Sequence, residues 1–335
     1  MARPKFLWWL AFPVLLLAPI AYISPWVACA QQPESWPHLT PDEIKLYQNA
    51  PTLLEWTPKE IHSHPELRSL HPAQSQGDLP RILDEVGKRI EVFFRDFRDT
   101  TCTEKIQAEA CRIETGLRIL PGGIPQEYGT GSMNCNVLYD GNFRYLRLVH
   151  MRKEVPFLEE YRTDAKGNAI DYDQLNGLPL LTYGFSAVAL YFHPLNRAAC
   201  RFHYFGRQMF KGLQTEVVGF AQIPEENTPV ITFKIGKLSG HILEQGLAWI
   251  DAATHEILCI QTDLLAPRPD LRMDKQTSKI DFKAIHLAEI SAPLWLPTKV
   301  VVDLESSHQH LRNTHSYSDF KMFRVESRIG AIPGN

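Results

Sequence analysis

Apolar residues recur at steps of three and four between Leu79 and Phe97, which is the spacing of one face of an α-helix. Charged residues fill the positions between them, and Asp78 precedes the first turn as a capping residue. The pattern predicts an amphipathic helix over residues 79–97, and its apolar stripe needs an apolar partner surface. The stripe consists of Leu79, Ile82, Leu83, Val86, Ile90, Phe93, Phe94 and Phe97.

A different pattern follows this helix. Apolar and polar residues alternate between Cys102 and Arg112, as in a half-buried β-strand. Most of the remaining chain predicts further strands joined by short turns, which favour antiparallel neighbours. A sheet this wide tends to curl, so we expect an α+β, mainly β fold with the amphipathic helix packed on the concave face of a large curled antiparallel sheet. The further strands cover residues 137–139, 143–149, 200–210, 215–223, 229–235, 246–250, 256–265, 279–287, 298–305 and 310–320.

Two dipeptides between predicted strands are typical of tight turns. Asp140-Gly141 and Lys211-Gly212 each predict a β-hairpin. Residues 183–193 form a short apolar segment that Pro194 ends, so we expect a helix there between strands. Residues 163–167 and the Pro-rich 266–270 are predicted loops.

The N-terminus has the pattern of a secretory signal peptide. A basic start is followed by an apolar run over residues 6–23 and by Ala28-Cys29-Ala30. We therefore expect cleavage after Ala30, a periplasmic or secreted protein, and no transmembrane segment after cleavage.

Two other interpretations of this segment stay open. An uncleaved membrane anchor would need about 20 apolar residues, and Pro13 and Pro19 interrupt the run. A lipoprotein signal would acylate Cys29, but Trp26 stands where such signals carry a small aliphatic residue.

The chain after the signal peptide (1–30) divides into three predicted parts. Residues 31–78 form a Pro-rich N-terminal arm with two short helices, because Thr40-Pro41 and Thr57-Pro58 are each followed by a glutamate at the third helical position. Residues 79–327 form the main domain, with a helical insertion near 183–194, and residues 328–335 form a C-terminal tail.

Composition excludes several classes of protein. The formal net charge is −3 and acidic and basic residues are interspersed, so the sequence has no electrostatic footprint for nucleic acid; 10% aromatic residues argue against wholesale disorder. Five cysteines follow the signal peptide, so at least one thiol has no intrachain partner. Cys102 and Cys111 would lie about 30 Å apart along one extended strand, too far for a disulfide. A bond from either to Cys135 stays open beside the alternative that all five are buried thiols; the other two are Cys200 and Cys259.

Catalytic motifs are absent from the sequence: it has no nucleophile elbow, no phosphate-binding Gly-Lys-Ser/Thr loop and no His-Glu-x-x-His. His308, His310 and His315 could approach a metal from one strand face, but His308 lies in a polar turn where exposed histidines are ordinary. We therefore predict no metal, no cofactor and no enzymatic activity. A hydrolase that depends on His310 is the least favoured alternative.

Several segments resemble the periplasmic lipoprotein-carrier superfamily, which includes LolA, LolB and RseB. They are Gly246–Leu258 with its Ala-Trp-Ile-Asp sequence, Lys279–Phe282, Leu294–Pro297 and the closing Tyr317-Ser318-Asp319-Phe320. The chain is also similar to a group of uncharacterised secreted bacterial proteins that share two of these phrases. The resemblance implies an unclosed β-barrel, a helix across its mouth and an apolar cavity between them.

The resulting functional hypothesis is an exported, non-enzymatic protein that binds a lipid or another hydrophobic or acylated ligand. Candidate lining residues come from the helix stripe and from two tryptophans in apolar strands, for which core packing is the alternative role. A cell-envelope interaction or regulatory module without a bound ligand is the second hypothesis, with a protein or lipoprotein partner. The candidate lining residues are Ile90, Phe94, Phe97, Trp249 and Trp295.

Overall fold

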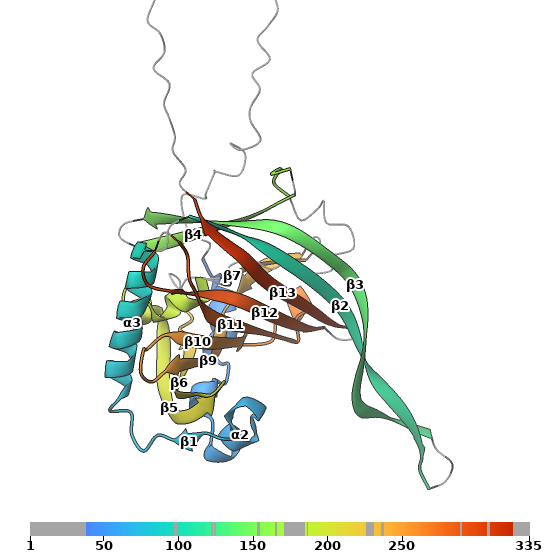
Figure 1. Cartoon of the computed structure of the whole chain (residues 1–335). Helices are drawn as coiled ribbons and strands as arrows, with labels where there is room; N and C mark the ends of the chain where they lie inside the picture. Colours follow the sequence, from blue (N-terminus) through green and yellow to red (C-terminus); the bar gives the residue numbers. More distant parts are fainter. Residues whose placement is uncertain are drawn as a thin grey trace, which may run out of the picture. The chain divides into compact units, whose positions relative to one another are not determined.

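The computed structural model describes residues 38–323, except 97–98, 122, 124, 153–154, 165, 171–184, 186, 226–230, 236–237, 289 and 307–308. The chain divides into two units, residues 1–36 and 37–335, and every described residue belongs to the second. The predicted signal peptide and C-terminal tail therefore lie outside the described residues, and the predicted domain boundaries stay predictions. Figure 1 shows the described unit as a wide twisted sheet with helices beside it.

The sheet confirms the mainly β class. It has eleven antiparallel strands, is not closed, and has the order β1-β5-β6-β9-β10-β11-β12-β13-β2-β3-β4, while β7 and β8 form a separate pair. The strands of this sheet are β1 His71–Pro72, β2 Thr100–Ile119, β3 Pro125–Arg152, β4 Val155–Thr163, β5 Cys200–Phe210, β6 Leu213–Gln222, β9 Glu244–Asp251, β10 Ile257–Leu264, β11 Lys275–Ile285, β12 Leu294–Ser306 and β13 Gln309–Met322. The separate pair is β7 Ile231–Ile235 and β8 Leu238–Ile242.

Within the described residues, three α-helices and several short 3-10 helices accompany the strands. The α-helices are α1 Pro41–Gln48, α2 Pro58–Ser63 and α3 Leu79–Asp96. The 3-10 helices are η1 Leu53–Glu55, η2 Pro65–Leu67, η4 Ala187–Phe192, η5 Arg197–Ala199 and η6 Pro269–Leu271.

The central strands are buried on both faces, which explains their continuous apolar runs. Ala248 and Ile250 of β9 belong to the main apolar cluster, together with residues of α3 and η4. Their neighbours Leu247 and Trp249 point the other way and join a second cluster with Leu53 of η1. Layers therefore cover both sides of β9: α3 and η4 on one face and the N-terminal arm on the other.

Helix α3 confirms the helix predicted from the apolar stripe. Its buried residues Ile82, Val86, Ile90 and Phe94 are spaced by four and pack with residues of the sheet in the main apolar cluster. The helix ends at Asp96, and Phe97 lies outside the described residues.

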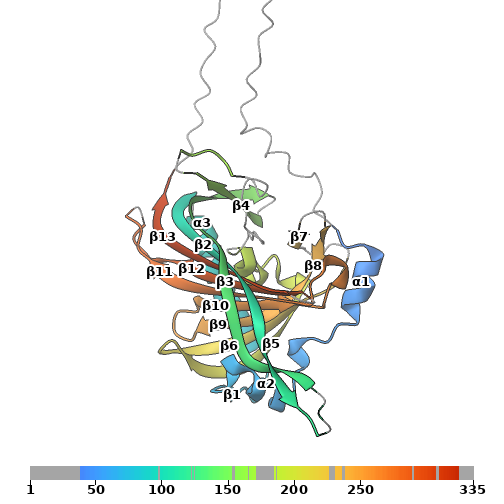
Figure 2. The same cartoon turned by 90° about the vertical axis from the view of Figure 1, so that its right-hand side faces the viewer.

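The N-terminal arm contains both predicted short helices. Thr40 and Thr57 cap α1 and α2 in complete capping boxes with Glu43 and Glu60, as the sequence predicted. The arm also contributes fully buried residues to the apolar clusters on the second sheet face, among them Tyr47 and Leu67. In Figure 2 α1 and α2 lie beside the sheet on the side away from α3.

The hairpin predicted at Asp140-Gly141 is wrong, because β3 runs through this dipeptide without turning. Gly141 pairs with Ile106 of β2. A Cβ at Gly141 would come within 2.4 Å of the Tyr139 hydroxyl, so the glycine makes room for that side chain. The actual turn follows Ile119, and β2 and β3 are much longer than the alternation indicated.

The Lys211-Gly212 hairpin is confirmed. Both residues have positive φ, 50° and 83°, as a tight turn between β5 and β6 requires. The strands β1, β4 and β8 were not predicted. In the predicted 183–194 helical segment, the described part contains η4, a 3-10 helix rather than an α-helix.

Beyond Cys111 and Cys135, β2 and β3 continue as a two-stranded extension that we call the distal hairpin (residues 112–134). The pairing of β13 with β2 ends at His310 and Cys111, whereas β2 and β3 stay paired to Ile119 and Pro125. Figure 1 shows this extension leaving the rest of the sheet. Among the described residues, no helix is both long and apolar enough to cross a membrane.

Candidate functional site

The structure brings three of the five predicted lining residues to one apolar cluster. Ile90 and Phe94 of α3 are buried in this cluster, and Trp295 of β12 packs against the cluster while partly exposed. Trp249 lies in the other cluster, fully buried and stacked on Phe210 with ring centroids 5.2 Å apart. Phe97 lies outside the described residues.

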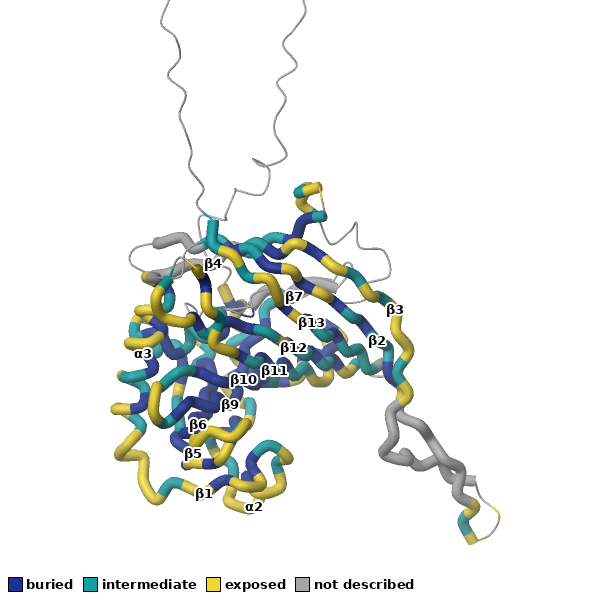
Figure 3. Tube along the Cα trace, viewed as in Figure 1, coloured by how far each residue is buried: buried dark blue, intermediate teal, exposed yellow. Residues whose placement is uncertain are grey.

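Partly exposed aromatic side chains of α3, β12 and β13 border the main apolar cluster. Phe93, Phe320 and Trp295 pack against the main cluster without being fully buried. Phe93 and Phe320 also contact a smaller cluster built on Leu294 and Leu296. We call this group the apolar margin, defined by Phe93, Trp295 and Phe320. Figure 3 shows buried residues concentrated on β6, β9 and β10, with α3 beside these strands.

A buried ionic network lies on β2, β4 and β13, on the face that bears the main cluster. Arg162 donates two hydrogen bonds to the carboxylate of Glu104, one of them 2.8 Å from Nη2 to Oε1. His315 Nδ1 and the Tyr317 hydroxyl each lie 2.9 Å from the same Oε1. The side chains of Glu104, Arg162 and His315 are 0% exposed, so the ion pair is held entirely out of water.

The charge state of this network follows from its contacts. Burial alone would raise the pKa of Glu104, but the Arg162 guanidinium and the hydrogen bonds from His315 and Arg162 lower it to about 2. Burial also lowers the pKa of His315. A neutral His315 must donate from Nδ1, since a carboxylate only accepts. The network is thus a fixed ion pair with neutral donors around it, suited to positioning β2, β4 and β13 rather than to proton transfer.

The network has a second buried pair beside it. Arg147 of β3 lies 3.5 Å from Glu160 of β4, measured from Nε to Oε1. The guanidinium carbons of Arg147 and Arg162 lie 5.8 and 5.2 Å from the ring centre of Tyr145, within cation–π range. The positive charges of two arginines are therefore offset by the negative charges of two glutamates inside the domain. No local sequence pattern predicts these two ion pairs.

The histidines that the sequence analysis considered as metal ligands, and for which it predicted no metal, make other contacts where they are described. His310 Nε2 lies 2.8 Å from Asp303, and His315 contacts Glu104, while His308 lies outside the described residues. Within the described ranges, no three side chains of the His, Cys, Asp or Glu type gather as metal ligands would.

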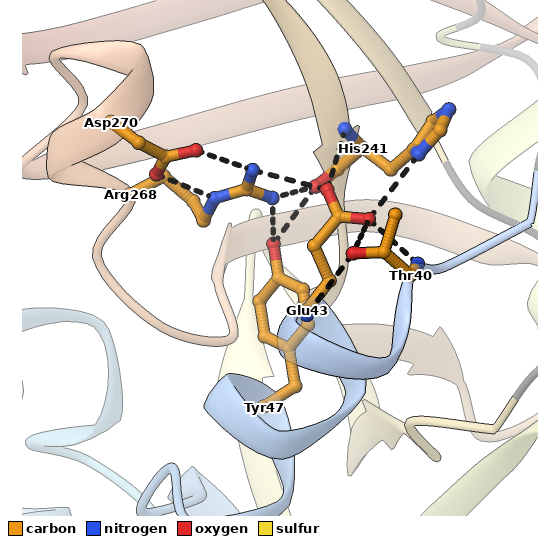
Figure 4. A network of polar contacts seen from close by, with 6 residues as sticks. All are labelled: Thr40, Glu43, Tyr47, His241, Arg268 and Asp270. Atoms are coloured by element: carbon orange, nitrogen blue, oxygen red, sulfur yellow. Dashed lines mark hydrogen bonds and ion pairs between the residues drawn. The ribbon is translucent and has the colours of Figure 1, made fainter.

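The N-terminal arm is fixed to the domain by a polar network around Arg268 (Figure 4). Arg268 donates to both Asp270 carboxylate oxygens, at 2.9 and 2.7 Å, and lies 3.1 Å from Glu43 of α1. It also donates to the Tyr47 hydroxyl at 3.2 Å and to the His241 carbonyl. The Arg268 side chain is 4% exposed, so water screens these contacts weakly. The network attaches α1 to β8 and to the loop before β11.

Among the described residues one cysteine pair forms a disulfide, Cys111–Cys135, whose two cysteines are 24 positions apart in the sequence. This is one of the alternatives left open by the sequence, and Cys102, Cys200 and Cys259 are buried free thiols. Burial raises the pKa of Cys102 and Cys200 to about 12, so neither is a ready nucleophile. The disulfide joins directly paired residues where the distal hairpin leaves the sheet.

Replacing both disulfide cysteines, Cys111→Ser with Cys135→Ser, should speed amide exchange in the distal hairpin by roughly tenfold or more. An isolated two-stranded hairpin is marginally stable in water, and a crosslink closing a loop of this size contributes about 3 kcal/mol. Hydrogen exchange with mass spectrometry measures the effect. Cys200→Ala, which removes a free thiol elsewhere, should leave the hairpin unchanged; equal exchange in the serine variant and the wild type would contradict the role of the disulfide.

Comparisons with known proteins give a limited result. No family model matches the chain, and no curated protein matches it. Among solved structures, it is similar to a proposed outer membrane lipoprotein-sorting protein domain from Vibrio parahaemolyticus, with 12% identity and a TM-score of 0.33 over 71% of this chain and 90% of that one. It is also similar to a DUF1329 family protein from Desulfovibrio piger, with 10% identity and a TM-score of 0.33 over 74% of this chain and 94% of that one.

The chain is thus structurally similar to a solved domain described as lipoprotein-sorting, the class of protein that its sequence resembles. At these identities and TM-scores, neither match bears on activity, ligand or partner.

Proposed function

We propose that this protein is an exported, non-enzymatic binding protein that holds a lipid or another acylated ligand between α3 and the sheet. In this proposal α3 lies on the concave face of the unclosed sheet. The apolar margin supports it most directly, because three aromatic side chains stay partly exposed there beside a large apolar cluster. Partly exposed aromatic groups at the edge of a core are typical of a surface that a hydrophobic ligand covers.

The ligand would enter at the apolar margin and extend along the face that bears Ile90 and Phe94. Trp295 would contact it first, since its side chain is partly exposed on β12. The fully buried Trp249 would contribute to the packing of the N-terminal arm instead. The buried ionic network would hold β2, β4 and β13 in register without touching the ligand.

Mass spectrometry of the mature protein purified from an exporting bacterium, under native conditions and after organic extraction, tests the proposal. We expect copurified lipid at near-unit stoichiometry. Trp295→Ala should lower lipid retention by roughly tenfold or more, because losing an aromatic contact of about 1.5–3 kcal/mol has at least that effect. Leu213→Ala, at an exposed leucine of the β5–β6 turn, is the control. A ligand-free protein would overturn the proposal, and its intact mass would still report cleavage after Ala30.

Exposed apolar residues of β3 beside the disulfide favour a second function, an envelope interaction module without a bound ligand. The residues next to the disulfide expose large apolar side chains, Val137 at 53% and Leu138 at 48%. A partner lost on Val137→Ser with Leu138→Ser, while the fold is unchanged, would support this alternative.

A further inference from the structure

A second buried carboxylate, Glu244 at the start of β9, has surroundings unlike those of Glu104. Its side chain accepts from the Thr262 hydroxyl at 3.0 Å and from the Tyr191 hydroxyl at 3.1 Å. The Tyr191 hydroxyl also lies 3.4 Å from the side-chain oxygen of Gln222. The whole residue is 3% exposed. Glu244 therefore lies inside the domain, and the side chains that donate hydrogen bonds to it are neutral.

None of the titratable groups that act on Glu244 carries a positive charge that would attract its carboxylate. They are Asp263 on β10, Tyr191 on η4 and Cys200 on β5, each neutral or acidic. Within the described part of the chain, no ion pair reaches this carboxylate. Burial, with the like charge of Asp263, raises the pKa of Glu244 to about 7, although the hydrogen bonds from Thr262 and Tyr191 oppose the shift.

Tyr191 connects this carboxylate to the position of η4. Its ring packs on Phe220 of β6, with centroids 5.2 Å apart. The next residue, Phe192, packs on both Phe220 and Phe202, at 5.7 and 5.4 Å. Through these rings η4 covers the apolar face of β5 and β6. A change in the protonation of Glu244 therefore acts on the helix that covers this apolar face.

We propose that Glu244 is a proton-operated latch for η4: the protonated carboxyl holds η4 on the sheet, and loss of the proton to water releases η4 and uncovers Phe202 and Phe220. An ionised Glu244 beneath η4 has no cation to offset its desolvation, and the lowest-energy response is to let water reach it. The latch needs no ligand; its role as a gate to the ligand-binding face rests on the function proposed above.

The direction of the pH effect follows from linkage. When η4 is seated, Glu244 holds its proton up to about pH 7, whereas a solvated glutamate loses it near 4.5. The seated state therefore binds more protons between these values, and seating weakens as pH rises through this interval and levels off above it. If Glu244 is fully solvated when η4 is released, the equilibrium constant for release rises roughly tenfold per pH unit within this interval.

Hydrogen exchange of peptides covering residues 187–199 in the mature full chain tests the latch, with rates corrected for the intrinsic pH dependence of exchange. In the wild type we expect opening to increase between pH 5 and pH 7 and to level off above pH 7. Glu244→Gln keeps the hydrogen-bonding oxygen and cannot ionise, so opening should not vary with pH. A flat wild-type profile, or an unchanged profile in Glu244→Gln, would overturn the latch.

Two further variants make the test specific. Burial also raises the pKa of Glu256 to about 7, but Glu256 lies at the opposite end of the β9–β10 hairpin. Glu256→Gln should therefore leave the η4 profile as in the wild type. If Glu244→Gln does not fold, Tyr191→Phe removes one donor to the carboxylate and should move the wild-type midpoint to higher pH; an unmoved midpoint would overturn the latch.

The gate is tested separately with the uncharged apolar dye N-phenyl-1-naphthylamine. Its binding should rise over the same pH interval in the wild type and not in Glu244→Gln. A flat dye signal with a responsive exchange profile would overturn the gate and leave the latch. Absence of copurified lipid would overturn the proposed function and leave the latch as well.

Discussion

Arg162→Met should lower the free energy of unfolding by about 3–5 kcal/mol, the typical loss when one partner of a buried ion pair is removed. Arg162 and Glu104 are both 0% exposed, so the variant leaves a carboxylate out of water without its cation. Chemical denaturation at pH 7, followed by tryptophan fluorescence, measures the change. The pKa of Glu104 should rise in this variant, and the difference from the wild type should shrink in acid.

Two controls separate the charge from the packing of the side chain. Lys105→Ala removes a cation at the adjacent position of β2, where the pair with Asp140 is about half exposed, and should cost no more than about 1 kcal/mol. Arg162→Met combined with Glu104→Gln removes both charges and keeps an acceptor for His315 and Tyr317, so stability should largely return. A loss below about 1 kcal/mol in the single variant would show that the pair does not hold the strands together.

The same pair gives the wild type an acid-sensitive component of stability. The folded-state pKa of Glu104, about 2, lies below the value of 4.5 for a solvated glutamate. A lowered pKa contributes stability that is present above the unfolded value and is lost as pH falls toward the folded value. Stability should thus decrease between about pH 4.5 and pH 2 for this group, the opposite direction from Glu244.

Trp249→Ala should cost a comparable amount, about 3–5 kcal/mol, because it empties a large fully enclosed volume. Trp249 is 0% exposed and packs between β6, β10 and the N-terminal arm. We expect residues 38–72 of the arm to become sensitive to limited proteolysis as the cluster loosens. Trp249→Phe keeps the stacking on Phe210 and should be much milder, since the indole Nε1 has no hydrogen-bond partner among the described residues.

Trp295→Ala is the matched comparison for Trp249, because its side chain is only partly buried. It should destabilise the fold less than Trp249→Ala while lowering lipid retention more. The reverse result, a stable Trp249→Ala protein that no longer retains lipid, would assign Trp249 to the ligand rather than to the core.

Local patterns in the sequence were sufficient for α3, for both capping boxes and for most strands. Each of these depends on residues within a few positions of one another, such as Thr40 with Glu43. The hairpin prediction at Asp140-Gly141 was wrong because it also depended on adjacent residues alone. Pairing of Gly141 with Ile106, within a much longer strand, outweighs the turn preference of the dipeptide.

The ionic network could not be predicted in the same way. Glu104 and Arg162 are 58 residues apart, and Arg162 lies on β4, which begins Val155-Pro156 and contains two adjacent glutamates. Such a segment has the composition of a loop. Only the pairing of β4 with β3, and of β2 with both β3 and β13, brings these side chains together.

The place of β13 in the sheet has a consequence for how the chain assembles. Within the sheet, β2, β3 and β4 are connected to the remaining strands only through β13. That strand pairs His310 with Cys111, almost two hundred residues earlier in the sequence. The β2–β3 hairpin and its disulfide can form as soon as their own residues have emerged, whereas the two blocks of strands join only after the last strand has been synthesised. Closure of so long a loop makes this step slow, and the edges of both blocks stay open until it is complete.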